Sequence, residues 1–110
     1  MKNIQLIKDF DPDGQSEMLK DLEVTQLFSG SFRQLVEVRL RNGAVLSKHK
    51  AKEPITVFCL AGTGVFKAGD DLEDSQGLRA GTLITLEADI NHEVTAKPDL
   101  HLIVTKFKDS

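Results

Sequence analysis

Three histidines and one cysteine are the side chains of this 110-residue chain best suited to chemistry. An imidazole can bind a divalent metal, exchange hydrogen bonds with a carbonyl, carboxylate or enol, or move a proton near neutral pH. His49 lies in an extended segment, residues 44–50, which leads through a turn at 52–54 into the apolar run 55–60. A strand, a turn and a second strand of this kind are typical of a β-barrel with an imidazole in its interior.

The side chains of these two segments sort into faces, because side chains alternate along a strand with a period of two. In the first segment Leu46, Lys48 and Lys50 share one face, and the other carries Val45, Ser47, His49 and Ala51. If the lysines face water, His49 faces the interior. In the second segment Ile55, Val57 and Cys59 share a face, and the opposite face is apolar too, so we expect a strand buried on both sides.

The rest of the chain reads as short strands separated by turns. Residues 32–40 alternate between apolar and charged side chains, which predicts a strand with one wet face. Asn42–Gly43 is a strong hairpin signal. We also expect turns at 11–14 and 97–99, a tight glycine hairpin at 62–64, a polar loop or solvated hairpin at 72–76 and a strand at 82–86. Eight to ten short strands with no long helix predict an all-β sandwich or barrel.

Two glycine–histidine spacings resemble the motifs of the cupin family. Gly43, five residues and His49, closed by Gly62, match part of the first motif, G-x5-H-x-H-x3,4-E-x6-G. Gly81 and His92 match part of the second, G-x5-P-x-G-x2-H-x3-N. The resemblance implies a small single-domain cupin, a jelly roll or double-stranded β-helix. Residues 30–110 would form the barrel, and residues 1–29 an arm and first strands of the same domain.

The chain departs from both motifs at positions that carry metal ligands or turns in the family. The usual ligand set is three histidines and one glutamate, of which His49 and His92 remain as an incomplete set. The replaced positions are Ala51, Ile55, Glu87, Asp89 and Ala96. A catalytic zinc or iron usually needs three protein ligands. We therefore expect a metal-free or weakly metal-binding protein, with a divalent Zn, Fe, Mn or Ni ion left open.

The same resemblance places His49 and His92 on adjacent strands at one barrel mouth. The expected pocket is mostly apolar and is lined by His49, Ala51, Ile55, Val57, Cys59 and His92. Such a pocket with a few convergent polar groups suits a small organic molecule. Each histidine can also be a core residue satisfied by backbone or water, and Cys59 a small buried hydrophobe. Cys59 or Glu53 remains open as a substitute ligand, as does the facing of His101.

Composition narrows the choice of partners and compartment. A net charge of −3 and a pI of about 5.5 disfavour nucleic acid and anionic membrane. The N-terminus lacks the apolar core of a signal peptide, and no apolar run approaches the roughly 18 residues of a membrane span. The single cysteine permits a reducing compartment, so we expect a cytoplasmic protein.

Three functions remain open from the sequence, and no catalytic residue is assigned. The first is binding of a small organic molecule, without a metal or with a weakly held one. The second is an oxygenase or isomerase that uses His49 and His92, either with a metal and an unconventional third ligand or as an acid–base pair. The third is a structural or regulatory homodimer, in which the apolar residues Ile4, Leu6 and Ile7 form an edge strand or an arm that pairs with a partner subunit.

Overall fold

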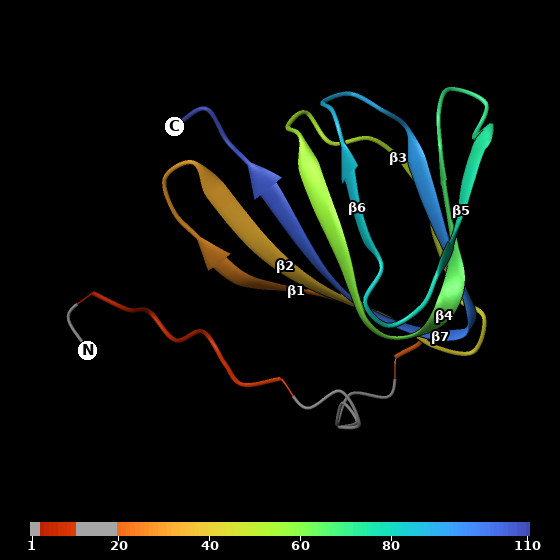
Figure 1. Ribbon diagram of the computed structural model, residues 1–110, viewed down its shortest axis with the longest axis horizontal. Helices are drawn as coiled ribbons and strands as arrows, with labels where there is room; N and C mark the ends of the chain where they lie inside the picture. The colour runs from red at the N-terminus through yellow and green to blue at the C-terminus, as the bar shows by residue number, and fades with distance from the viewer. Residues whose placement is uncertain (1–2, 11–19) are drawn as a thin grey trace.

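The computed structural model describes residues 3–10 and 20–110, and this part of the chain is built from seven strands and no helix. The strands are β1 (Leu22–Ser29), β2 (Arg33–Leu40), β3 (Val45–His49), β4 (Ile55–Ala68), β5 (Asp74–Leu78), β6 (Leu83–Leu86) and β7 (His92–Phe107). They pair antiparallel in the order β1-β2-β7-β4-β5, with β3 on β7 and β6 on β4. Figure 1 shows this sheet curled around a common interior, which confirms the expected all-β jelly roll.

Two long strands, β4 and β7, run through both halves of the barrel and correct the expected strand count. They pair from Ile55 opposite Lys106 to Ala68 opposite His92. The turns expected at 62–64 and 97–99 lie inside these strands, where the register shifts. Gly62 has φ +89°, and a Cβ there would overlap the carbonyl oxygen of Asp99. The glycines therefore allow close backbone approach at a bend instead of forming a hairpin.

The strands and turns predicted from local sequence patterns elsewhere in the chain are only partly confirmed. The strand expected at 32–40 is β2, and Asn42 and Gly43 both have positive φ in the turn that follows it. The hairpin that Asn42–Gly43 indicates was wrong, because β3 pairs with β7 and not with β2. Of the two alternatives for 72–76, a loop or a solvated hairpin, the hairpin is present, because β5 pairs with the end of β4 there. The side chains of β5 are mostly polar and exposed, so they lack the apolar alternation from which a strand is predicted. The turn expected at 11–14 lies outside the described residues.

The core fills the interior face of the barrel and comes from most of the strands. Its buried apolar side chains include Val36, Val38 and Leu40 of β2 and Leu100 and Leu102 of β7. The expectation that β4 is buried on both sides was wrong, since Phe58 on its outer face is 38% exposed. A barrel closed around one core leaves its outer face to solvent wherever nothing covers it.

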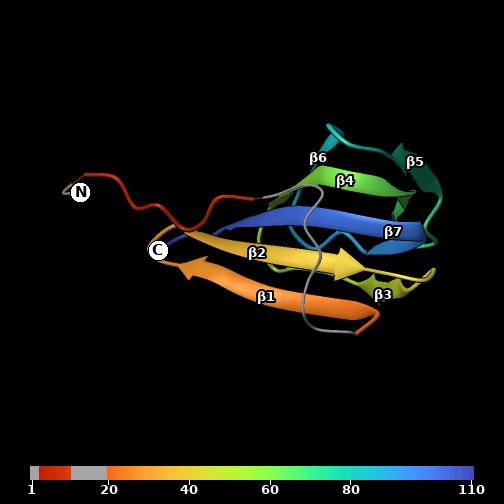
Figure 2. The ribbon, with the colours of Figure 1, turned by 90° about the horizontal axis from the view of Figure 1, so that it is seen from below.

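The N-terminal arm, residues 3–10, is extended chain without strand pairing, so the edge strand expected there is absent from the described residues. Figure 2 shows it beside β2 and β7, on the outside of the barrel. The Phe10 ring lies 5.9 Å from the ring of His101, and Lys8 reaches Glu37. His101, whose facing the sequence left open, is thus on the outer face and buried at 4% exposure.

Candidate ligand-binding cavity

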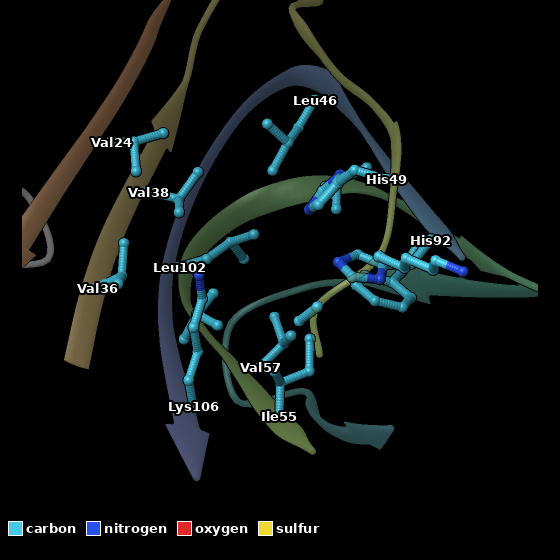
Figure 3. A pocket seen from close by; sticks show the side chains of 15 residues that line it. Val24, Val36, Val38, Leu46, His49, Ile55, Val57, His92, Leu102 and Lys106 are labelled. Carbon is cyan, nitrogen blue, oxygen red and sulfur yellow. The ribbon is translucent and has the colours of Figure 1, made fainter. Parts of the chain in front are cut away.

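A cavity of about 170 Å³ opens into the barrel between β3, the start of β4 and β7. Its wall is mostly aliphatic, and its polar side chains are two histidines and two lysines, with no acidic residue from the described part of the chain (Figure 3). The apolar lining is Val24, Val36, Val38, Leu46, Ala51, Ile55, Val57, Phe66, Val94, Leu102 and Val104; the polar lining is His49, Lys50, His92 and Lys106.

His49 ends β3 at the rim of the cavity, where its side chain is exposed. The pairing of β3 with β7 shifts register between Leu46, opposite Val94, and His49, opposite His92. Because of this irregularity Leu46 and His49 both face the cavity, although they differ in parity. The expectation that Leu46 and Lys50 point away from the interior was therefore wrong, since both line the cavity.

His92 begins β7 deeper in the cavity and is 5% exposed. Its ring stacks on Phe66, with centroids 5.6 Å apart and planes inclined by 9°. The His49 ring meets it edge to face, with centroids 4.1 Å apart. Packing against one ring and an edge contact from another fix the orientation of the His92 imidazole.

Backbone carbonyls set the tautomers of both imidazoles. The Nδ1 atom of His49 lies 2.7 Å from the Ser47 oxygen, and Nδ1 of His92 lies 3.1 Å from the Ile90 oxygen. A carbonyl only accepts, so each Nδ1 carries a proton and donates it. In the neutral rings each Nε2 is then left with a lone pair that can accept a hydrogen bond.

Burial keeps His92 neutral. Desolvation lowers the pKa of its imidazole most, the hydrogen bond to Ile90 offsets part of this, and electrostatic interactions with the neighbouring His49 and Lys106 lower it further. The net pKa lies below its ordinary value. His92 is therefore a hydrogen-bond acceptor and a potential base at neutral pH, rather than a cation.

The residues present do not complete the metal site that the fold suggests. Within residues 3–10 and 20–110 no three histidine, cysteine or acidic side chains come together to hold a metal ion. Cys59, one proposed substitute ligand, is fully buried, and its thiol donates to the Ala61 carbonyl oxygen at 3.4 Å. Burial also raises the pKa of this thiol, which disfavours the thiolate a metal would need. His49 and His92 alone leave a zinc or iron centre one ligand short.

The structure brings together five of the six residues expected in the pocket: His49, Ala51, Ile55, Val57 and His92. Cys59 is not among the lining residues. Sequence reasoning missed Lys106, which shares a face of β7 with two apolar lining residues, Leu102 and Val104. That two-residue spacing in the last strand was the available signal.

No family model and no curated protein matches the chain. Solved structures do. A conserved protein of unknown function from Streptococcus pyogenes has a TM-score of 0.78 at 17% identity, over 98% of this chain and 93% of that one. A cupin superfamily protein from Desulfitobacterium hafniense has a TM-score of 0.77 at 14% identity, over 98% and 97%.

A third neighbour is an RmlC-like cupin family protein with a double-stranded β-helix fold from Methanocaldococcus jannaschii. Its TM-score is 0.75 at 15% identity, over 94% of this chain and 91% of that one. The fold is that of the cupins. At these identities the likeness concerns architecture, and the chemistry of this domain has to be argued from its own cavity. No helix in the described residues is long and apolar enough to cross a membrane.

Proposed function

We propose that this cupin domain binds a small organic molecule in the cavity between β3, β4 and β7, without requiring a metal. One observation carries the proposal. Two imidazoles with centroids 4.1 Å apart line an otherwise largely apolar cavity, and their Nε2 atoms have no hydrogen-bond partner among the described residues. An apolar wall supplies affinity by burying carbon, and a few fixed polar atoms supply orientation.

The volume limits the size of the ligand. An engineered protein cavity of about 150 Å³ accepts benzene. The cavity here, about 170 Å³, therefore suits a molecule of similar size, about six to eight non-hydrogen atoms. A nucleotide or an oligosaccharide would exceed it.

The test is a thermal-shift screen of small acids, alcohols and sugars, followed by calorimetry on each hit. We expect a stabilising compound whose affinity falls at least about tenfold in His92→Ala and in His49→Ala. Glu87→Ala is the matched control, because Glu87 is exposed in a loop and is not part of the cavity lining. Hits that bind both histidine variants as tightly as the parent protein would overturn the proposal.

A second candidate function is proton transfer on such a ligand, as in an isomerase. The observation that favours it is the burial of His92, which keeps a neutral imidazole beside a second imidazole. An enzyme of this kind would exchange a ligand C–H proton with solvent. Incubation of each hit in deuterium oxide, followed by proton NMR, would show loss of that signal with the parent protein but not with His92→Ala. Unchanged signals for every hit would exclude it.

Self-association remains a further proposal. Ile4 and Leu6 of the arm are 65% and 63% exposed, which is unusual for neighbouring large apolar side chains. We infer that they contact a second copy of the chain in a homodimer. Light scattering at micromolar concentration should give a dimeric mass for the parent protein and a monomeric mass for the double variant Ile4→Ser, Leu6→Ser. A monomeric parent would contradict this.

A further inference from the structure

Lys106 places an ammonium group in the cavity, and the described residues provide no counter-charge for it. Its side chain is half-buried, and it extends from β7 along the inner wall towards Leu102 in Figure 3, with His92 across the cavity in that view. No ion pair joins Lys106 to any acidic side chain within residues 3–10 and 20–110, and none of the lining residues is acidic. An ammonium against an apolar wall is costly without an anionic partner.

A purely structural explanation for Lys106 is that the side chain only covers apolar surface while its charge stays in water. Two features argue against it as the whole account. The residue lines the same cavity as both imidazoles, and its charge acts on His92 across that cavity, lowering the imidazole pKa. Lys50 adds a second cation at the rim. The charge of the cavity is thus cationic only, which selects for an anion.

Lys106 and the two histidines complement different functional groups of one ligand. Lys106 can only donate, so it suits a carboxylate. The Nε2 atom of His92, a neutral imidazole protonated at Nδ1, can only accept, so it suits a hydroxyl or an amine N–H. The Val and Leu wall between them suits a short carbon chain.

Building on the proposed function, we propose that the cavity binds a small aliphatic hydroxycarboxylate. The carboxylate pairs with the Lys106 ammonium, and the hydroxyl donates to Nε2 of His92. Lys106 is on this view a determinant of specificity, because a neutral ligand of equal size leaves its ammonium unpaired. The bound acid contributes the negative charge that the cavity lacks.

The test compares three small probes of nearly equal shape: 3-hydroxybutyrate, butyrate and 1,3-butanediol. Binding is followed by calorimetry and by NMR shifts of the cavity residues. We expect the parent protein to prefer 3-hydroxybutyrate at least about tenfold over each of the other two, since each lacks one of the matched groups. Lys106→Met should remove the preference for 3-hydroxybutyrate over the diol, and His92→Gln should reduce the preference over butyrate.

Two control variants test whether a change in affinity is specific to the charge at Lys106. Lys67→Met removes an exposed lysine of β4 and should leave all three affinities unchanged, and Lys106→Arg should retain the preference for the acid. Thermal unfolding of each variant shows that it is folded. A diol that binds as well as the acid, with an affinity that depends on His92, overturns the hydroxycarboxylate but leaves the proposed function standing. Three probes that all fail to shift cavity resonances count against this ligand class, and the wider screen then decides the proposed function.

Discussion

Nε2 of His101 lies 2.6 Å from Oε2 of Glu37, in a buried pair on the outer face of β2 and β7. Nδ1 of His101 is buried without a hydrogen-bond partner in the described part of the chain. A charged imidazolium would leave that N–H unpaired, so His101 is neutral and donates from Nε2 to an ionised carboxylate. Lys8 from the arm, 3.4 Å from Glu37, completes the contact and ties the arm to the barrel.

Removing the Glu37 carboxylate should destabilise the folded protein. Glu37→Ala leaves the buried His101 N–H without its acceptor and frees Lys8, so we expect a loss of about 1–3 kcal/mol in the free energy of unfolding. Glu37→Gln keeps an acceptor for His101 and should lose less. Urea unfolding measures both, with the exposed Glu87→Ala expected within about 0.5 kcal/mol of the parent. A Glu37→Ala protein as stable as that control would mean that the pair contributes nothing net.

Stability should fall on acidification in two stages. Burial lowers the pKa of His92 and of His101 below the usual histidine value of 6.5, in each case only partly offset by hydrogen bonding. Burial alone would raise the pKa of Glu37, but the hydrogen bond from His101 and the charge of Lys8 bring it below 4.5. In all three cases the unfolded chain takes up the proton first as the pH falls. Stability is therefore lost below about pH 6.5 for the histidines and below about pH 4.5 for Glu37.

The loss of stability below about pH 6.5, which is due to the histidines, is measurable by urea unfolding at closely spaced pH values. Each histidine adds at most about 1.4 kcal/mol per pH unit to the slope. His101→Gln should flatten the stage below pH 6.5 by one histidine's share, whatever its effect on stability at neutral pH. A slope identical to that of the parent protein would show that His101 does not titrate differently on folding.

Gly62 should be intolerant of any side chain. With φ +89° and the Asp99 carbonyl oxygen where a Cβ would stand, Gly62→Ala must displace the backbone of β7. We expect a loss of about 3 kcal/mol or more, as for other strained or overpacked positions. Gly77→Ala in β5 is the matched control, because a Cβ there meets nothing within 4 Å; we expect a change below about 1 kcal/mol. Equal stabilities of the two variants would refute the role assigned to the bend.

Metal analysis should separate the binding cavity from a metalloenzyme. With only His49 and His92 available among the described residues, the purified, untagged protein should retain well under one metal ion per chain after growth with iron, manganese, nickel and zinc. His49→Ala should give the same trace amount. Near-stoichiometric metal that disappears in His49→Ala would contradict this and indicate a further ligand that completes the site.

Features that depend on neighbouring residues could be predicted from the amino-acid sequence. Alternation in residues 32–40 and the Asn42–Gly43 signal identified β2 and the turn that follows it, since both depend on backbone preferences of neighbouring residues. The glycine–histidine spacings pointed to the cupin jelly roll and to His49 and His92 at one opening. Turns and alternating faces indicated an all-β sandwich or barrel, and the resemblance to the cupin motifs selected the jelly roll and the shared opening.

Features that depend on the pairing of distant strands with β7 became visible in the three-dimensional structure alone. The register shift in β3 brings Leu46 into the cavity together with His49, against simple alternation. The approach of Asp99 turns Gly62 from an apparent hairpin into a bend in a continuous strand. Lys106 joins the cavity because the last strand lies beside the first half of β4. Register and bulges are set by partners distant in sequence, so a pattern read along the chain cannot contain them.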